Sequence, residues 1–289
     1  MFPSLYHLLF VGCCLVLLAA PASAGDLAEV REKGLLRVAV YKDYPPYSYL
    51  EKGKMVGVDV DLAKALAERL GVGMSTMNLT ASDEAMEDDL RNAIWKGHYL
   101  GTGTADVMLH VPVDEAFAAA NDQVTIFGPY YQEQVAIAHH RERLSEIPSM
   151  ALFASTPIAV ELETISDGYL SWSFNRRLLP NVVRFRHFPE ACGALHQGEV
   201  PALMAPIAQL EYCLQTGEAD AFAISEVPGG GIGLFRWTVG MAVKEDHDEL
   251  AAALETALAG LVTDGTLEAI YQRHGLSYRP PPVALSDAR

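Results

Sequence analysis

The side chains that most often carry out catalysis or bind metals do not occur here in any familiar spacing. The sequence has no Cys-x-x-Cys pair, no His-Glu-x-x-His motif, no glycine-rich phosphate loop and no recognisable pairing of a nucleophile with a base. We therefore expect no structural zinc site, no other metal, no cofactor and no catalytic residues.

Thr164 and Ser166 stand at the start of a helix that we predict over Ser166–Phe174, with Ile165 between them. Hydroxyl groups and free backbone N–H groups at a helix start suit an anion or a polar oxygen. This loop is therefore a candidate for non-covalent binding.

Four cysteines occur, of which Cys13 and Cys14 lie near the N-terminus and Cys192 and Cys213 lie far along the chain. Two cysteines in an oxidising compartment can pair. The sequence does not give the distance between them. A disulfide between Cys192 and Cys213 and two separately buried thiols on helices both remain open.

Composition excludes several classes of protein. The chain has 289 residues, with 37 acidic and 21 basic side chains, so its formal charge is 21 − 37 = −16. Half of the residues are apolar and a fifth are charged, which is typical of a globular protein. This acidity argues against a nucleic-acid-binding protein, because such a protein must neutralise phosphates with Lys and Arg. No basic cluster suits an anionic membrane surface.

The N-terminal segment predicts export. Residues 1–24 contain no Asp, Glu, Lys or Arg, and the apolar run Leu8–Ala20 is followed by Pro21 and Ala22-Ser23-Ala24. This pattern is typical of a signal peptide with a small-x-small cleavage site. We expect cleavage after Ala24 and a periplasmic protein that does not span the membrane. An uncleaved membrane anchor is the alternative.

Strand and helix patterns alternate along the rest of the chain. Short runs rich in branched residues predict strands, and apolar residues at helical spacing predict helices. We expect strands at Leu35–Val40, Ala105–Val111, Gln134–His139, Pro157–Val160, Val182–Phe185, Pro201–Ala205 and Trp237–Val243. We expect helices at Val58–Leu70, Asp88–Trp95, Ser166–Phe174, Glu190–His196, Ala208–Leu214, Glu249–Val262 and Leu267–Tyr271.

This alternation favours an α/β fold with two lobes, each an open and mostly parallel sheet flanked by helices. In open α/β sheets ligands bind beyond the carboxyl ends of the strands, and pockets are common at domain boundaries. We therefore expect a ligand-binding cleft between the lobes.

Several segments then resemble one known family. They are Leu36–Val40, Tyr44–Tyr49, Gly57–Ala63, Gly128–Tyr131, Val239–Val243 and Asp264–Tyr271. Their order and sequence resemble the bacterial extracellular solute-binding proteins of the polar-amino-acid type. The resemblance implies a monomeric periplasmic protein that closes two lobes over a small-molecule ligand and delivers it to an ABC permease. It places the first lobe at residues 25–131 plus 240–289 and the second lobe at 132–239.

Two departures from the family pattern concern the ligand. Family members carry an arginine for the ligand carboxylate just after the strand that here is Ala105–Leu109, but no arginine occurs between Arg91 and Arg141. They also place an aspartate for the ligand ammonium where this chain has Ala205. Leaving a carboxylate and an ammonium unpaired in a closed cleft costs several kcal/mol, so we expect a ligand other than an ordinary α-amino acid.

The resemblance also implies which residues contact the ligand. In this family an aromatic residue after the first strand stacks on the ligand, which points to Tyr44 and Tyr47. The candidate ligand-binding residues are Tyr44, Tyr47, Trp95, His110, Val111, Asp114, Thr164, Ile165, Ser166 and Ala205. Trp95 equally fits a core position, and a single histidine such as His110 is more often structural.

Three functions follow from these observations. The first is solute binding for an ABC importer. The second is association with a periplasmic quinoprotein alcohol dehydrogenase, since some relatives with an eroded amino-acid pocket accompany such enzymes. The insertion at 96–104 fits a partner surface, a reshaped cleft or a neutral surface loop. The third and weakest is catalysis by cleft carboxylates, for which Asp114, Glu115, Glu161 and Glu163 are candidates.

Overall fold

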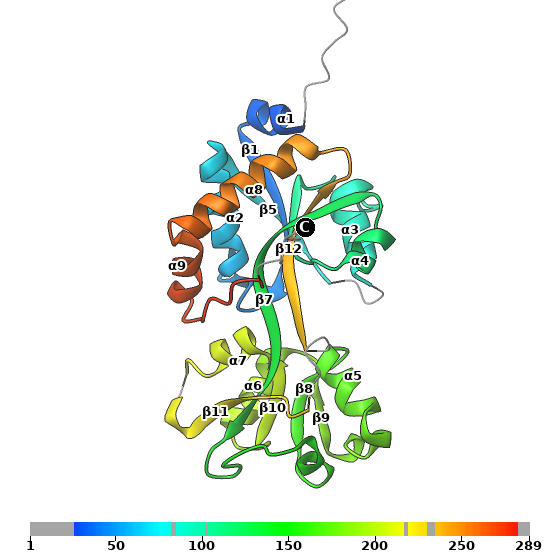
Figure 1. Cartoon of the computed structure of the whole chain (residues 1–289), viewed down its shortest axis with the longest axis vertical. Coiled ribbons are helices and arrows are strands. Elements are labelled where there is room, and N and C mark those ends of the chain that lie inside the picture. Colours follow the sequence, from blue (N-terminus) through cyan, green and yellow to red (C-terminus); the bar gives the residue numbers. More distant parts are fainter. Residues whose placement is uncertain (1–25, 82–84, 102, 217–218, 230–234, 283–289) are drawn as a thin grey trace, which may run out of the picture.

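Two lobes joined by two long strands make up the protein. The computed structural model describes residues 26–81, 85–101, 103–216, 219–229 and 235–282. In Figure 1 the lobes lie one above the other, and β7 (Val124–His140) and β12 (Arg236–Lys244) run from one to the other. The expected α/β fold with two lobes is confirmed.

The sheet of the first lobe, at the top of Figure 1, has the strand order β5-β1-β6-β12-β7. β1 (Leu35–Tyr41) pairs in parallel with β5 (Gly73–Leu79) and with β6 (Val107–Pro112). β12 returns from the second lobe and pairs antiparallel with both β6 and β7. A separate three-stranded sheet follows β1, formed by β2 (Asp43–Tyr44), β3 (Ser48–Glu51) and β4 (Lys54–Val56).

Helices cover the first sheet. They are α1 (Asp26–Lys33), α2 (Val58–Leu70), α3 (Met86–Leu90), the π-helix η1 (Arg91–Trp95), α4 (Glu115–Ala120), α8 (Asp248–Thr263) and α9 (Thr266–Arg273). α2 buries Val58, Leu62 and Leu66, which share one face, and it ends at Gly71 in the left-handed conformation. α8 packs against α1 and α2, although both helices lie near the other end of the sequence.

The second lobe continues from β7 in the order β7-β10-β8-β9, with β11 on the other side of β7. Its strands are β8 (Ile158–Glu161), β9 (Val182–Phe185), β10 (Ala202–Pro206) and β11 (Phe222–Glu226). Its helices are α5 (Ile165–Trp172), α6 (Phe188–His196) and α7 (Ile207–Cys213), with short 3₁₀ turns η2 (Met150–Ala154), η3 (Phe174–Arg176), η4 (Leu179–Asn181) and η5 (Ala219–Ala221). β8 pairs in parallel with β9 and β10, as expected from the alternating pattern.

Several elements differ from the sequence prediction. The segment predicted as one helix over Asp88–Trp95 is a short α-helix followed by a π-helix. The segment predicted as Gln134–His139 belongs to a strand of 17 residues, because the pairing with β12 extends it into the first lobe. The small sheet β2–β4 was not predicted, because its strands are too short to show a periodic pattern.

The boundaries expected between the lobes, near residues 131 and 239, fall inside β7 and β12. No chain break or linker marks them, so the division into 25–131 plus 240–289 and 132–239 stays a proposal. Residues 1–25, which include the predicted signal peptide, lie outside the described residues.

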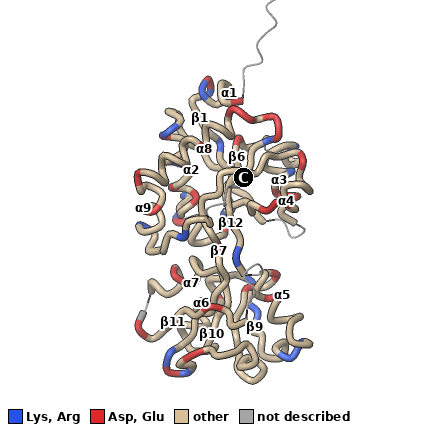
Figure 2. Tube along the Cα trace, viewed as in Figure 1, with Lys and Arg blue, Asp and Glu red and all other residues tan. Residues whose placement is uncertain are grey.

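Acidic positions outnumber basic ones on both lobes, and the two kinds are interspersed (Figure 2). No single described helix is long and apolar enough to span a membrane. α8 and α9 taken together meet the length and composition criteria for a membrane span, but they are bent by 73° at the break between them.

A disulfide joins Cys192 of α6 to Cys213 of α7. The two Cα atoms are 5.8 Å apart, and the residues are separated by 21 positions in the sequence. Apolar side chains around the bridge include Ala194, Leu210 and Phe222. The bridge therefore fixes α7 against α6 within the second lobe.

We predict that replacing both cysteines by alanine lowers the free energy of unfolding by about 3 kcal/mol, because the unfolded chain regains the entropy of a loop of this length. Urea denaturation followed by circular dichroism measures the change. Adding a reductant should destabilise the wild-type protein and leave the double variant unaffected. Equal stability of the oxidised and reduced wild-type protein would contradict the prediction.

Candidate functional site

A group of polar side chains is buried in the first lobe, close to the point where β7 and β12 leave it. We call Tyr47, Asp59, His110, Tyr130 and Glu133 the polar cluster. Every member has at most 6% of its surface exposed. Such a concentration of buried charge costs free energy unless each group has a partner, so its contacts indicate what the site does.

A β-bulge positions His110. In the pairing of β6 with β12, Val111 lies opposite Gly240 and Leu109 opposite Met241, which leaves His110 as the extra residue. Its backbone has a positive φ of 63°, a conformation that non-glycine residues rarely adopt. The His110 N–H donates to the Tyr130 hydroxyl at 2.9 Å instead of joining the strand ladder.

Asp59 holds the other side of His110. It lies in the first turn of α2, where its charge is favourable at the positive end of the helix dipole. Its Oδ1 accepts a hydrogen bond from the Tyr130 hydroxyl at 3.0 Å. Its Oδ2 lies 3.2 Å from His110 Nδ1, although the ring is turned so that neither of its nitrogens makes a hydrogen bond.

Glu133 is fully buried on β7, in the register position opposite Trp237 of β12. Neither of its carboxylate oxygens makes a hydrogen bond to another described group. The Tyr47 hydroxyl faces this carboxylate and lowers its pKa, but the two groups do not reach hydrogen-bonding geometry. A buried carboxylate without a close partner is rare and calls for a functional explanation.

The protonation of Glu133 follows from this environment. Burial raises the pKa of its carboxyl group to about 7, and the nearby Asp59 charge acts in the same direction. His110, Tyr47 and Arg279 partly oppose this increase. Glu133 can therefore gain or lose a proton near neutral pH.

Aromatic rings surround the cluster. The Tyr47 ring lies 4.2 Å from the His110 ring and 5.0 Å from the Tyr44 ring, measured between centroids. Tyr44 meets His110 edge to face at 5.2 Å. Gly57 keeps Tyr47 in place, because a Cβ atom there would overlap the Tyr47 carbonyl oxygen and because its φ of 122° suits only glycine.

The second lobe meets the first beside these tyrosines. Ala208 of α7 packs in the same apolar cluster as Tyr47. Gln209 Nε2 donates to the Pro45 carbonyl oxygen at 3.4 Å, and Tyr212 bonds to Tyr49 at the same distance between hydroxyl oxygens. Glu161, at the end of β8, raises the pKa of the Tyr44 hydroxyl together with burial and Glu133.

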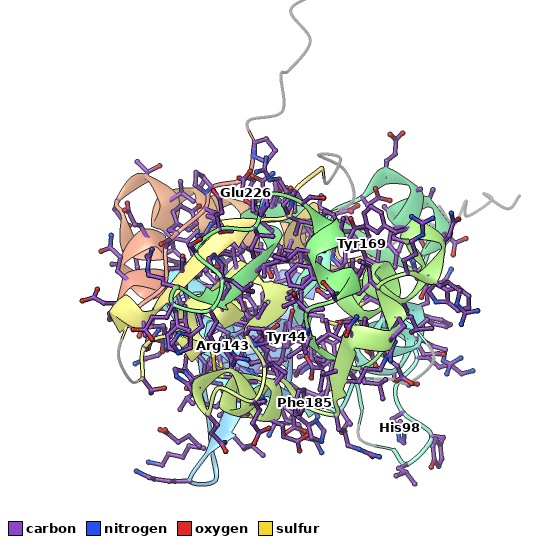
Figure 3. All side chains as sticks on the ribbon, turned by 90° about the horizontal axis from the view of Figure 1, so that it is seen from below. Tyr44, His98, Arg143, Tyr169, Phe185 and Glu226 are labelled. Carbon is purple, nitrogen blue, oxygen red and sulfur yellow. A yellow bond between two sulfur atoms is a disulfide. The ribbon has the colours of Figure 1, made fainter. Side chains whose placement is uncertain are left out.

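Tyr44 therefore lies at the junction between the lobes. In Figure 3 it is near the centre of the view, within the outline of the molecule, whereas His98 is at the edge.

Arg279, in the segment after α9, reaches the same junction. Its guanidinium group donates to the Tyr131 hydroxyl at 3.1 Å and to Glu211 of α7 at 2.6 and 3.4 Å. The Arg279 carbonyl oxygen accepts from the Gln132 N–H at 2.9 Å. This arginine is therefore held by groups of both lobes, and Glu211 neutralises its charge.

The structure brings three of the candidate residues together: Tyr44, Tyr47 and His110. Two others have local structural roles. Asp114 accepts from the Phe117 N–H and caps α4, and Thr164 accepts from the Asp167 N–H and caps α5. Asp114 thus uses its carboxylate within its own turn.

The remaining candidates are distributed elsewhere. Val111 and Ala205 are buried among apolar side chains of the two lobes. Ile165 is half exposed, and Ser166 is buried with a hydroxyl oxygen that makes no hydrogen bond. Trp95 lines a separate cavity of about 280 Å³ between η1 and the segment after α4. Ligand contacts of all these residues stay predictions.

Sequence reasoning missed Asp59, Tyr130 and Glu133. Asp59 lies inside the apolar pattern of the helix Val58–Leu70, where a carboxylate is unexpected. Glu133 occupies a buried position of a strand most of whose other buried residues are apolar or aromatic, such as Tyr131 and Val135. Charged residues at core positions were the available signal.

One group of side chains in the described parts of the chain has metal-ligand spacing. The Sγ atoms of Cys192 and Cys213 and one ring nitrogen of His196 lie within 4.8 Å of one another. The two sulfur atoms are joined in the disulfide, and His196 Nε2 contacts the Cys213 carbonyl oxygen at 2.9 Å. This group is therefore a structural bridge with a supporting histidine.

Known proteins resemble the chain at different levels. The family model of bacterial extracellular solute-binding proteins, family 3, matches residues 36–97. An L-cystine-binding protein of Escherichia coli (strain K12) is 24% identical over 257 residues, which are 87% of this chain and 86% of that protein.

The other two comparisons concern a segment and the fold. A cyclohexadienyl dehydratase of Pseudomonas aeruginosa is 46% identical over 72 residues, but these are only 24% of this chain and 27% of the enzyme. Among solved structures, an ancestral cationic amino acid solute-binding protein superposes with a TM-score of 0.68 at 23% identity. The alignment covers 86% of this chain and 98% of that protein, so the two share a fold.

We predict that Glu133→Gln stabilises the ligand-free protein at pH 8 by an amount on the order of 3 kcal/mol. The pKa of Glu133 in the folded state lies above that in the unfolded chain, so its contribution to stability is greatest below about pH 4.5 and is lost as the pH rises through 7. Gln removes this loss because it does not ionise.

Urea denaturation of both proteins at pH 4.5 and at pH 8 measures the difference. Glu226→Gln makes the same change at an exposed residue and should have little effect at either pH. An equal effect of Glu133→Gln at both pH values would contradict the prediction.

Proposed function

We propose that the chain is a member of the bacterial extracellular solute-binding proteins of the polar-amino-acid type, and that it binds a small solute between its two lobes for delivery to an ABC permease. The observation that supports this most directly is the position of Tyr44 and Tyr47. Their rings lie beside the buried polar cluster. The pKa of the Tyr44 hydroxyl is raised by burial, by Glu133 and by Glu161 of the second lobe. A solute in this position would contact both lobes.

We further propose that the solute is not an ordinary α-amino acid. The bulge residue His110 and the capping residue Asp114 stand in the region where the family pattern has its arginine. The guanidinium group of Arg279 acts on Glu133 electrostatically, but it is already paired with Glu211. The β10 residue Ala205 offers no charge for a ligand ammonium.

The relatives bear on this proposal in two ways. Two of them are named for binding cystine and cationic amino acids, so both are solute-binding proteins. The dehydratase matches only about a quarter of the chain, and the family consists mostly of binding proteins. We therefore propose binding rather than catalysis.

A second candidate function is association with a periplasmic quinoprotein alcohol dehydrogenase. One observation favours a partner surface: Tyr99 and Leu100, in the insertion at 96–104, are 88% and 70% exposed. Analytical ultracentrifugation of the protein mixed with the dehydrogenase of its own organism separates the two candidates. A complex that Tyr99→Ser and Leu100→Ser abolish would favour this function.

We predict that none of the twenty common α-amino acids binds with a submicromolar dissociation constant. Losing both charge anchors should weaken binding by about a hundredfold or more, because each charged hydrogen bond in a closed site contributes roughly 1.5–3 kcal/mol. Isothermal titration calorimetry of the mature protein measures this, with the cystine-binding relative and L-cystine as a positive control. Submicromolar binding of any amino acid would contradict the proposal.

A further inference from the structure

Unpartnered polar atoms gather at one point of the first lobe. They are the Tyr47 hydroxyl, both ring nitrogens of His110 and both carboxylate oxygens of Glu133. All belong to side chains that are 94% or more buried. Because such atoms lose their hydrogen bonds to water without replacement, they indicate a place where another molecule supplies the missing partners.

The charges of this group do not balance. Asp59 and His110 face each other at 3.2 Å, and Asp59 also accepts from Tyr130. Arg279 acts on Glu133 only from a distance, since its guanidinium group is bonded to Glu211 and Tyr131. His110 also lowers the pKa of Glu133, but Glu133 makes no hydrogen bond or ion pair with His110 or Arg279, so it is the carboxylate of the cluster without a direct positive partner among the described residues.

Tyrosine rings complete the environment. The faces and edges of Tyr44 and Tyr47, whose centroids are 5.0 Å apart, lie beside His110 at the junction of the lobes. Aromatic faces attract cations, and the attraction increases when water is excluded. A positive group placed between these rings and Glu133 would meet both a carboxylate and a π system.

We infer that Glu133 recognises a positively charged group of the solute, and that this solute is an organic cation, an amine or a guanidine, without a carboxylate. This inference rests on the proposed function, because it assumes that a solute binds at the junction of the lobes. It adds the residue that selects the solute and the chemical class of the solute. No described arginine or lysine is unpaired at the cluster to neutralise a carboxylate.

Proton release accompanies binding in this arrangement. A cation favours the ionised carboxylate, so Glu133 loses its proton when the solute binds near neutral pH. Affinity should therefore rise with pH. The other titratable or charged groups that face Glu133 are Tyr44 on β2, Tyr47 after β2, Asp59 on α2, His110 on β6, Tyr131 on β7, Tyr271 on α9 and Arg279 after α9.

The test uses two matched pairs of compounds that differ by a carboxylate: agmatine with L-arginine, and cadaverine with L-lysine. Isothermal titration calorimetry of the mature protein gives each dissociation constant at pH 6 and pH 8. We expect each amine to bind more tightly than its amino acid, and about tenfold more tightly at pH 8 than at pH 6. Buffers with different ionisation enthalpies should reveal the released proton.

The variant Glu133→Gln should raise the dissociation constant of the amines about tenfold or more and remove its dependence on pH. Glu226→Gln, the same change at an exposed residue, should alter it by no more than about twofold. Circular dichroism verifies that both variants are folded.

The inference has two parts, cation recognition by Glu133 and the absence of a carboxylate from the solute, and different results contradict each. If the amines bind equally well to Glu133→Gln, or if none of the four compounds binds at millimolar concentration, recognition of a cation by Glu133 is wrong. Solute binding for an ABC permease is a separate proposal, which this result would leave in place for a solute of another class. If each amino acid binds as tightly as its amine and both need Glu133, cation recognition holds and the exclusion of α-amino acids is wrong.

Discussion

A single strand belongs to both sheets, and the rest of the structure is arranged around it. β7 enters from the first lobe, where it pairs with β12, and continues into the second lobe, where it pairs with β10 and β11. Between these regions Gln132, Glu133 and Gln134 pair with β12 alone. Side chains at this point lie between the two cores, so a charged residue there has neither the solvent of a surface nor the fixed partners of a well-packed interior.

The sequence predicted the two-lobed fold well because its signals are local. The helix Val58–Leu70 has the predicted bounds, since its apolar spacing and Gly71 act within a few residues. The site was less predictable. Tyr44, Tyr47 and His110 were candidates, but Asp59 and Glu133 come from other elements, and only the packing of α2 and β7 places them beside His110. The bulge at His110 depends on the register with β12, which residues adjacent in sequence do not determine.

Residues that cap helices show the limit of reasoning from residue type. Asp114 was a candidate for ligand contact because it lies where the family pattern has its arginine, and Thr164 because it stands at the start of a predicted helix. Each binds a backbone N–H of its own helix. An acidic or hydroxyl side chain before a helix fits both roles equally well in the sequence, and only the side-chain contacts separate them. By contrast, Glu133 has no local use for its charge, which makes its burial more informative.

The position of β12 in the first sheet also bears on the order in which the protein can fold. β12 lies between β6 and β7, yet it follows β6 in the chain by more than a hundred residues. The second lobe is contained in the intervening segment and is complete before β12 emerges during synthesis. The first sheet must therefore keep a central position open until late, with the edges of β6 and β7 exposed. The protein can therefore complete its first sheet only when most of its chain is available, and closing this sheet depends on contacts between residues far apart in the sequence.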